Sequence, residues 1–191
     1  VLDILMEAVN ARPAKPAVLR RDSTVPDDWL PVGMQHANLR PDIIIERAGR
    51  VCLADVRVSW ATDRAYGNAA GKSTLEVAAD DKCNKYEPLA SEIRRHTGMP
   101  VVVLPLVFGS SCIVPKRTRK AVKELVYGIG ADPMDADRQQ PASKWVEAEL
   151  SRLLHKCASS AARHTHDIWI SHQQMIRKVH DQRAPVPQVQ A

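Results

Sequence analysis

The spacing of apolar side chains in the first part of the chain predicts one helix and then a pair of strands. Residues 1–9 have apolar side chains at helical spacing, and a proline-containing stretch ends this helix. Residues 17–41 contain three prolines and a glycine, so we expect a long connection with at most one short strand. Residues 42–46 and 51–58 are short β-rich runs, which we expect to pair as a hairpin through Arg47–Arg50.

After the hairpin the pattern changes to a helix followed by a buried strand. Residues 60–72 are polar and predict a crossing segment, which connects the hairpin to the next helix. Residues 73–97 have apolar side chains at helical spacing, and Pro88 should break or kink this helix. Gly98 ends this helix, and residues 99–108 form a continuous apolar run. Such a run is typical of a strand buried on both faces of an α/β sheet, so we expect a parallel neighbour.

The last third of the chain is predicted to be helical with breaks. Within a first domain over residues 1–127, residues 116–127 form a short basic amphipathic helix. Residues 128–141 are rich in Asp, Gly and Pro and predict a linker, while residues 142–180 contain two apolar stripes that favour a helical hairpin. Residues 181–191 are rich in Pro and Gln and are expected to be an unstructured tail.

Composition narrows the class of protein. The chain has 191 residues, enough for one compact domain with appendages, and its 45% hydrophobic and 26% charged residues exclude a disordered tail or a membrane span. The net charge of +5 favours an anionic partner, with nucleic acid as the first candidate.

Four cysteines without a CxxC pair indicate a reducing, intracellular compartment. The chain begins with Val, so we expect it to be part of a longer reading frame.

The hairpin register predicts a paired acidic site. If the turn is centred on Ala48–Gly49, Asp42 lies directly opposite Asp55. Opposed side chains are about 4.5 to 5.5 Å apart at Cβ, and like charges there are destabilising, so a hard divalent cation such as Mg²⁺ (or Mn²⁺) is expected between them. Five apolar side chains are expected on the opposite, buried face of the hairpin: Ile43, Ile45, Ala54, Val56 and Val58.

Three residues of the following helix are expected to complete this site. Lys82, Lys85 and Tyr86 stand at positions i, i+3 and i+4, so they project from one side of the helix. Spacing alone does not choose between the two lysines. Two carboxylates, an ammonium group and a divalent cation are the components of a phosphodiester hydrolase.

Basic residues elsewhere are candidates for contacts with DNA phosphates. Arg57 stands two positions after Asp55, where its fixed charge makes a poor base and a good phosphate ligand. A basic run begins the helix at 116 and is equally consistent with solvated charges. Its candidate DNA contacts are Lys116, Arg117, Arg119 and Lys120.

The combination Arg40-Pro41-Asp42, twelve intervening residues, Asp55-Val56 and then Lys82-x-x-Lys85-Tyr86 resembles a known family. It is similar to the restriction-enzyme-like endonuclease domain of site-specific non-LTR retrotransposons of the R-two type, from the first helix to about residue 126. The resemblance implies a PD-(D/E)xK-like α/β core sheet flanked by helices. It also implies metal binding by Asp42 and Asp55, a catalytic Lys82 or Lys85 displaced to the helix, and a supporting Tyr86. Ordinary PD-(D/E)xK nucleases have lysine at the position of Arg57.

The resemblance further implies that the chain is the C-terminal endonuclease part of a retrotransposon Pol protein. Such a protein acts in the nucleus, nicks double-stranded target DNA, with ribosomal RNA genes as one target, and extends the exposed end with an upstream reverse transcriptase that copies element RNA. Two copies could act together on the target. The alternatives are a host repair or recombination nuclease of the same fold and a non-catalytic nucleic-acid-binding module.

Overall fold

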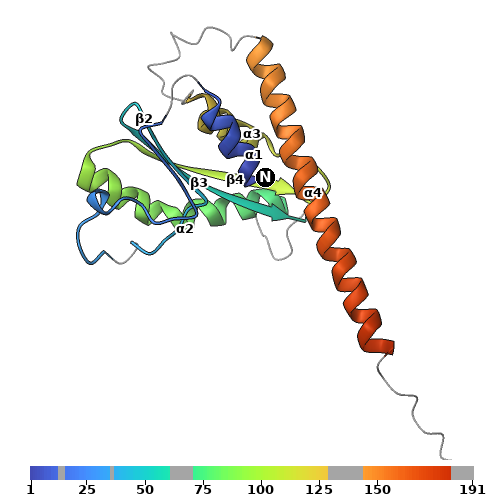
Figure 1. Ribbon diagram of the computed structural model, residues 1–191. Coiled ribbons are helices and arrows are strands. Elements are labelled where there is room, and N and C mark those ends of the chain that lie inside the picture. The colour runs from blue at the N-terminus through green and yellow to red at the C-terminus, as the bar shows by residue number, and fades with distance from the viewer. Residues whose placement is uncertain (13–15, 35–36, 61–70, 129–143, 182–191) are drawn as a thin grey trace, which may run out of the picture.

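The computed structural model describes the chain in five ranges: residues 1–12, 16–34, 37–60, 71–128 and 144–181. The elements in order are α1 (Leu2–Asn10), β1 (Val18–Arg21), the 3-10 turn η1 (Asp27–Trp29), β2 (Ile43–Arg47), β3 (Arg50–Ser59), α2 (Thr74–Thr97), β4 (Val101–Gly109), α3 (Lys116–Tyr127) and α4 (Lys144–Asp181). They form an α/β fold around one four-stranded mixed sheet (Figure 1). None of the helices in the described ranges combines the length and apolar character needed to cross a membrane.

The sheet has the order β1-β2-β3-β4, and its register follows from one tight turn. Ala48 and Gly49 both have positive φ, 51° and 71°, as a two-residue type I′ hairpin turn requires. Arg47 therefore pairs with Arg50, and the ladder continues to Ile43 opposite Ala54. The predicted hairpin is confirmed. β4 lies parallel to β3, with α2 in the connection, which confirms the predicted parallel neighbour.

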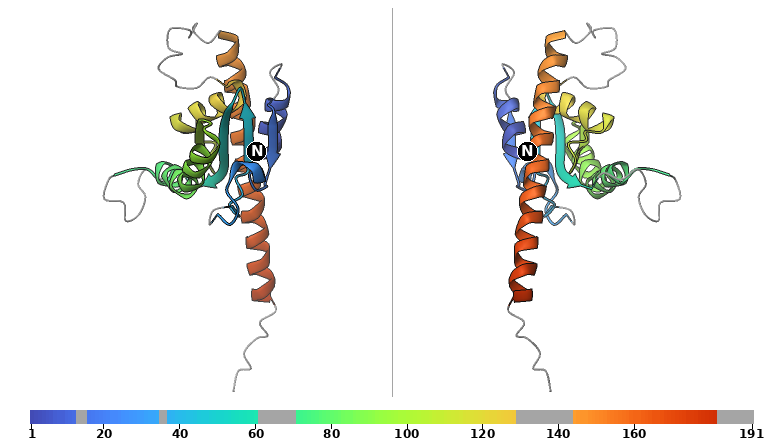
Figure 2. Two further views of the ribbon diagram at one scale, coloured as in Figure 1. Left: turned by 90° about the vertical axis from the view of Figure 1, so that its left-hand side faces the viewer. Right: turned by 90° about the vertical axis from the view of Figure 1, so that its right-hand side faces the viewer.

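Helices cover both faces of the sheet (Figures 1 and 2). On one face, Ile44 and Leu53 pack with Tyr86 and other apolar residues of α2 and with η1. On the other face, α1, α3 and α4 cover a second cluster that includes Ile43, Ile45 and Ala54. Both faces of the hairpin are therefore buried at its centre.

One predicted member of the buried face is wrong. Val56 is partly buried against the α1, α3 and α4 cluster, whereas the side chain of Val58 is 36% exposed. The β2 ladder ends where Ile43 meets Ala54, so the last residues of β3 pair only with β4 in the described part of the sheet. Val58 consequently lies at an edge, beyond the cover of the neighbouring strand.

The helix that carries the candidate lysines has defined ends. Ser73 and Glu76 form a capping box at the start of α2, and Gly98 ends it in the left-handed conformation with a φ of 72°. The helix runs unbroken through Pro88, so the predicted break is absent. Pro88 is exposed, while the next residues, Leu89 and Ala90, are fully buried and hold the helix on the sheet.

The predicted helical hairpin over 142–180 is also wrong, because α4 is one continuous helix of 38 residues. No glycine or proline occurs between Lys144 and Asp181, so nothing ends the helix between the two apolar stripes. The first half of α4 is integrated into the fold, and its second half projects beyond the sheet in all views (Figures 1 and 2). The buried residues of the first half include Leu150, Leu153, Leu154, Cys157 and Ala161.

Three predicted connections lie largely outside the described residues: the crossing segment, the linker over 128–141 and the tail over 181–191. The short strand expected in the first connection is β1, and the predicted helix over 116–127 is α3, with identical bounds.

Candidate functional site

The two candidate carboxylates come together at the end of the β2–β3 ladder. The last pair of that ladder is Ile43 with Ala54, and Asp42 and Asp55 follow it in the same register. The side chain of Asp42 accepts a hydrogen bond at 2.6 Å from the backbone N–H of Val56, the residue after Asp55. Asp42 is half-buried and Asp55 is only 4% exposed. The structure therefore brings the predicted acidic pair together.

Helix α2 supplies the groups that surround Asp55. The ammonium group of Lys82 forms an ion pair with Oδ2 of Asp55, an oxygen that is buried and has no hydrogen bond of normal geometry. The hydroxyl of Tyr86 donates a hydrogen bond of 2.5 Å to Oδ1 of the same carboxylate. Both contacts come from one face of the helix, as the spacing predicted, and they leave neither oxygen of Asp55 without a partner.

The structure separates the two lysines. Lys82 is mostly buried and contacts the carboxylate, whereas Lys85 is exposed and contacts Tyr86. The Nζ atom of Lys85 donates to the Tyr86 hydroxyl at 2.9 Å and lies 4.6 Å from the centroid of the ring. Lys82 is thus in direct contact with Asp55, and Lys85 is linked to that carboxylate through Tyr86.

The surroundings of the Asp42 and Asp55 carboxylates disfavour additional negative charge. Burial raises the pKa of Asp42, and the neighbouring Asp55 raises it further, against the lowering effects of the Val56 N–H and Lys82. Burial and the hydrogen bond to Asp55 raise the pKa of Tyr86, so its hydroxyl stays protonated and can donate. The site would therefore be stabilised by a cation.

One acidic residue near the site is absent from the sequence prediction. Asp22 follows β1, whose last pair is Arg21 with Ile43, so Asp22 stands next to Asp42 in the same register. Its backbone N–H donates to the carbonyl of Asp42 at 3.0 Å, and its charge contributes to the raised pKa of Asp42. Asp22 itself is exposed. Its position depends on pairing across a connection of about 20 residues, and no local spacing indicates it.

The residues present fit a magnesium ion by donor type. Mg²⁺ is usually held by one or two carboxylates, and waters fill its remaining positions. Asp42 and Asp55 supply such carboxylates, and burial together with the neighbouring Asp55 raises the pKa of Asp42. In the described ranges no group of three or more His, Cys, Asp or Glu side chains is arranged to hold a metal ion. Any cation here would therefore depend on these two carboxylates and on solvent.

The candidate DNA-binding residues do not form one continuous surface. Arg57 is exposed and lies 3.4 Å from Asp81 of α2. Arg117 also turns toward α2, where it contacts Asp80 at 2.6 Å, whereas Arg119 turns toward α4 and contacts Glu147 at 2.7 Å. The other two residues of the basic run, Lys116 and Lys120, are exposed. Arg57 and Arg117 consequently lie nearer the acidic pair's side of the fold than Arg119 does.

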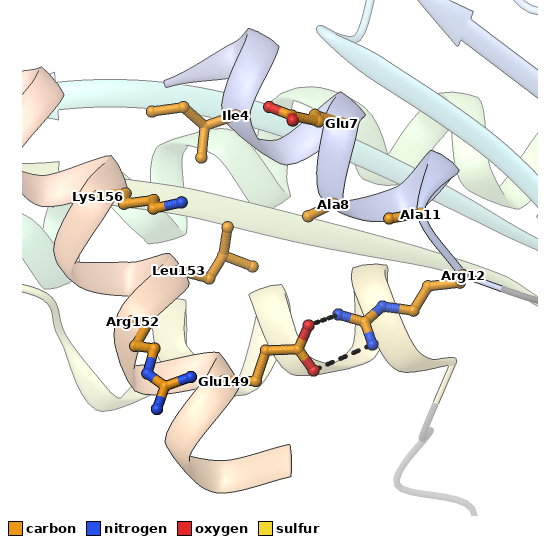
Figure 3. Close-up of a pocket in the computed structure, with 9 residues that line it drawn as sticks. All are labelled: Ile4, Glu7, Ala8, Ala11, Arg12, Glu149, Arg152, Leu153 and Lys156. Carbon is orange, nitrogen blue, oxygen red and sulfur yellow. Dashed lines mark hydrogen bonds and ion pairs between the residues drawn. The ribbon is translucent and has the colours of Figure 1, made fainter. Parts of the chain in front are cut away.

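A separate cavity of about 360 Å³ lies between α1 and α4 (Figure 3). Leu153 is one of the lining residues, and Arg12 and Glu149 close one end through two hydrogen bonds of 3.1 and 2.6 Å. Lys156 points across the cavity toward α1 in the same view. Because Arg12 and Glu149 neutralise each other, we interpret this end as a contact between the two helices.

Comparison with protein-family models and with curated proteins gives no match for this chain. The interpretation of the site therefore depends on its own geometry.

Proposed function

We propose that this chain is a metal-dependent phosphodiester hydrolase that nicks DNA. The observation that carries the proposal is the junction of Asp42 and Asp55 at the end of one ladder, with the Lys82 ammonium paired to the buried Asp55. Burial of two adjacent carboxylates and a lysine costs free energy, because each charge loses its hydration. A contribution to stability alone therefore does not account for this arrangement. Such clusters are typical of catalytic sites.

Each described side chain has a role in this proposal. Asp42 and Asp55 would hold Mg²⁺ or Mn²⁺, and when bound the cation polarises the phosphate and a coordinated water. Lys82 stabilises negative charge that develops on the phosphate. Tyr86 holds Asp55 in one orientation through its hydrogen bond, and Lys85 in turn contacts Tyr86.

The substrate and biological role are proposed from charge and motif. The net charge of +5 and the exposed Arg57, Lys116 and Lys120 favour double-stranded DNA. The motif resemblance supports the nuclease part of a non-LTR retrotransposon Pol protein, which would act in the nucleus beside a reverse transcriptase. A reverse transcriptase in the upstream reading frame would support this role, and its absence would favour a host repair nuclease of similar fold.

The test is a nicking assay on supercoiled plasmid with Mg²⁺, compared with the same reaction containing a chelator. Asp55→Asn keeps the shape of the side chain and should lower the nicking rate about 100-fold or more. Asp28→Asn is the matched control, because Asp28 is an exposed carboxylate in η1, and it should nick like wild type. Thermal melting should establish that both variants are folded.

Two outcomes contradict the proposal. Equal nicking by wild type and Asp55→Asn would mean that the acidic pair is not the active site. Binding of plasmid without any nicking by wild type in Mg²⁺ or Mn²⁺ would favour the non-catalytic binding module. In that case Lys82 would be a permanent structural partner of Asp55.

A further inference from the structure

A second site lies where the end of β3 meets α4. A cavity of about 250 Å³ there is lined by six residues: Trp60, Ser110, Ala162, Thr165, His166 and Trp169. The two tryptophans come from positions 109 apart in the chain and are 67% and 51% exposed, although indole rings are usually well buried. Two large aromatic surfaces facing solvent around one cavity are not explained by the packing of the fold.

The backbone on the strand side of this cavity is fixed in place. The carbonyl of Ser59 accepts a hydrogen bond of 2.9 Å from the N–H of Ser110, which joins the ends of β3 and β4. The carbonyl of Trp60 accepts a bond of 2.6 Å from the hydroxyl of Thr74 at the start of α2. Trp60 is therefore presented from an anchored position, and Trp169 is presented from a helix. Rigid presentation lowers the cost of ordering the site when a ligand binds.

The cavity also contains polar groups suited to the edge of a ring. The hydroxyl oxygen of Ser110 is buried and has no hydrogen-bond partner in the described structure. His166 adds an exposed imidazole, whose Nδ1 lies 3.8 Å from a carboxylate oxygen of Asp167. An apolar peptide side chain would leave the Ser110 hydroxyl unpaired, which is costly, whereas a nucleobase has donors and acceptors along its edges.

The size of the cavity and the charge of the chain favour the same ligand. A volume of about 250 Å³ is below the 300 to 1,000 Å³ of sites for drug-sized molecules, so it suits a single ring system. None of the six lining residues is acidic, and the chain has a net charge of +5. Stacking of bases on aromatic side chains in a positively charged setting is the common mode of binding to single strands.

We propose that the cavity between Trp60 and Trp169 binds one unpaired nucleobase of a single-stranded nucleic acid. This rests on the proposed function in that the same molecule would be the nuclease substrate or its product. Trp60 directly follows β3 and is five residues beyond Asp55, or about 17 Å along extended chain, which corresponds to about five phosphates along one strand of a DNA duplex. The site would thus hold unpaired bases close to the nick.

Between the two sites, β3 has no strand partner on its β2 side within the described ranges. Asp55 lies on the α2 face of the sheet, where it contacts Lys82 and Tyr86, whereas Trp60 lines a cavity together with residues of α4, which covers the other face. Residues 57–59 pair only with β4 in the described sheet, so the other edge of β3 is open between the two sites. Arg57 and Val58 are exposed along it. A single strand can pass from one face to the other here without crossing a neighbouring strand.

The test measures binding of a short fluorescent oligothymidylate and, in a second arm, an oligouridylate to the full chain. Trp60→Ala and Trp169→Ala should each weaken binding about 5- to 150-fold, the range for loss of one stacked base. Trp169→Phe keeps an aromatic face and should retain most of the affinity. Trp145→Ala is the matched control, because Trp145 is 62% exposed on the same helix and outside the cavity. Comparing the two arms distinguishes DNA from RNA as the source of the base.

Intrinsic fluorescence provides a second readout of the same event. Oligothymidylate should quench the emission of wild type and of Trp145→Ala, and much less that of a Trp60→Ala, Trp169→Ala double variant. Wild-type affinity in both single alanine variants, or an equal loss in Trp145→Ala, would overturn the proposal. Quenching that depends on the two tryptophans in a chain that never nicks plasmid would refute the nuclease and support this site. Nicking without such quenching would do the reverse.

Discussion

The sharpest test of the site's internal structure compares two lysines that are three residues apart. Lys82 is paired with the buried Asp55, and their side chains are 19% and 5% exposed. Lys85 is exposed and contacts the hydroxyl and ring of Tyr86. The substitutions Lys82→Met and Lys85→Met remove the same charge from the same helix, so helix propensity is closely matched between them.

The expected loss of stability differs because the two partners differ. Removal of one member of a buried ion pair costs about 3 to 5 kcal/mol, since the other charge stays buried without compensation. The hydrogen bond from Tyr86 still satisfies one oxygen of Asp55, and Lys82 is partly exposed, so we expect the lower end, about 3 kcal/mol. For Lys85→Met we expect at most about 1 kcal/mol, as for exposed charges in general.

Thermal and chemical denaturation can measure this difference. In a domain of this size about 1 kcal/mol corresponds to about 2 to 4 °C in Tm, so Lys82→Met should melt about 6 to 12 °C lower and Lys85→Met at most about 4 °C lower. In an Asp55→Asn background the cost of Lys82→Met should shrink, because no buried charge remains. If the proposed function is correct, Lys82→Met should also slow nicking about 100-fold or more.

Equal losses of Tm in the two lysine variants would refute this reasoning, as would a cost of Lys82→Met that is unchanged in the Asp55→Asn background. Either result would mean that Lys82 does not compensate the buried negative charge of Asp55.

Three further predictions concern neighbouring parts of the structure. Tyr86→Phe removes a hydrogen bond to the buried Asp55 and should cost about 1.5 to 3 kcal/mol, seen as a lower urea midpoint with an unchanged m-value; an unchanged midpoint contradicts the contact. Burial raises the pKa of Asp42 above its value in the unfolded chain, so ionisation of Asp42 opposes folding. The free energy of unfolding of wild type, relative to that of Asp42→Asn, should therefore fall as pH rises from about 3 to about 7. A relative stability that rises over this range would contradict the prediction. Leu150→Ala in the buried half of α4 should cost about 2 to 5 kcal/mol, whereas Ile168→Ala in its exposed half should change stability by less than about 0.5 kcal/mol; a small loss for Leu150→Ala would mean that the helix is separable.

The parts of the site that were predictable from the sequence depend on local geometry. The Ala48–Gly49 turn sets the register of β2 and β3, so counting outward from it places Asp42 next to Asp55. The three-and-four spacing of α2 then places Lys82 and Tyr86 on one face. The first inference depends on the pairing register that one turn sets, and the second depends on the repeat of one helix. Tertiary packing changes neither of them.

The parts that were missed depend on contacts between distant segments. Asp22 reaches the site through pairing of β1 with β2, and nothing near it in the sequence specifies that pairing. Trp60 and Trp169 line one cavity because α4 passes the ends of β3 and β4. The prediction of a hairpin over 142–180 is wrong for a local reason, because no glycine or proline ends the helix between the two apolar stripes. The stripes are the buried and projecting halves of α4.

The integration of α4 into the core has a consequence for how the protein is made. Leu150, Leu154 and Ala161 close the sheet face that α1 and α3 leave partly open, and they are among the last core residues to leave the ribosome. At about 5 to 20 residues per second, the 34 residues that follow Tyr127, up to Ala161, take about 2 to 7 s to synthesise. During that interval the sheet face is exposed on the nascent chain. Translation rate and chaperone supply should therefore affect the yield of this protein more than that of a domain whose core is completed early.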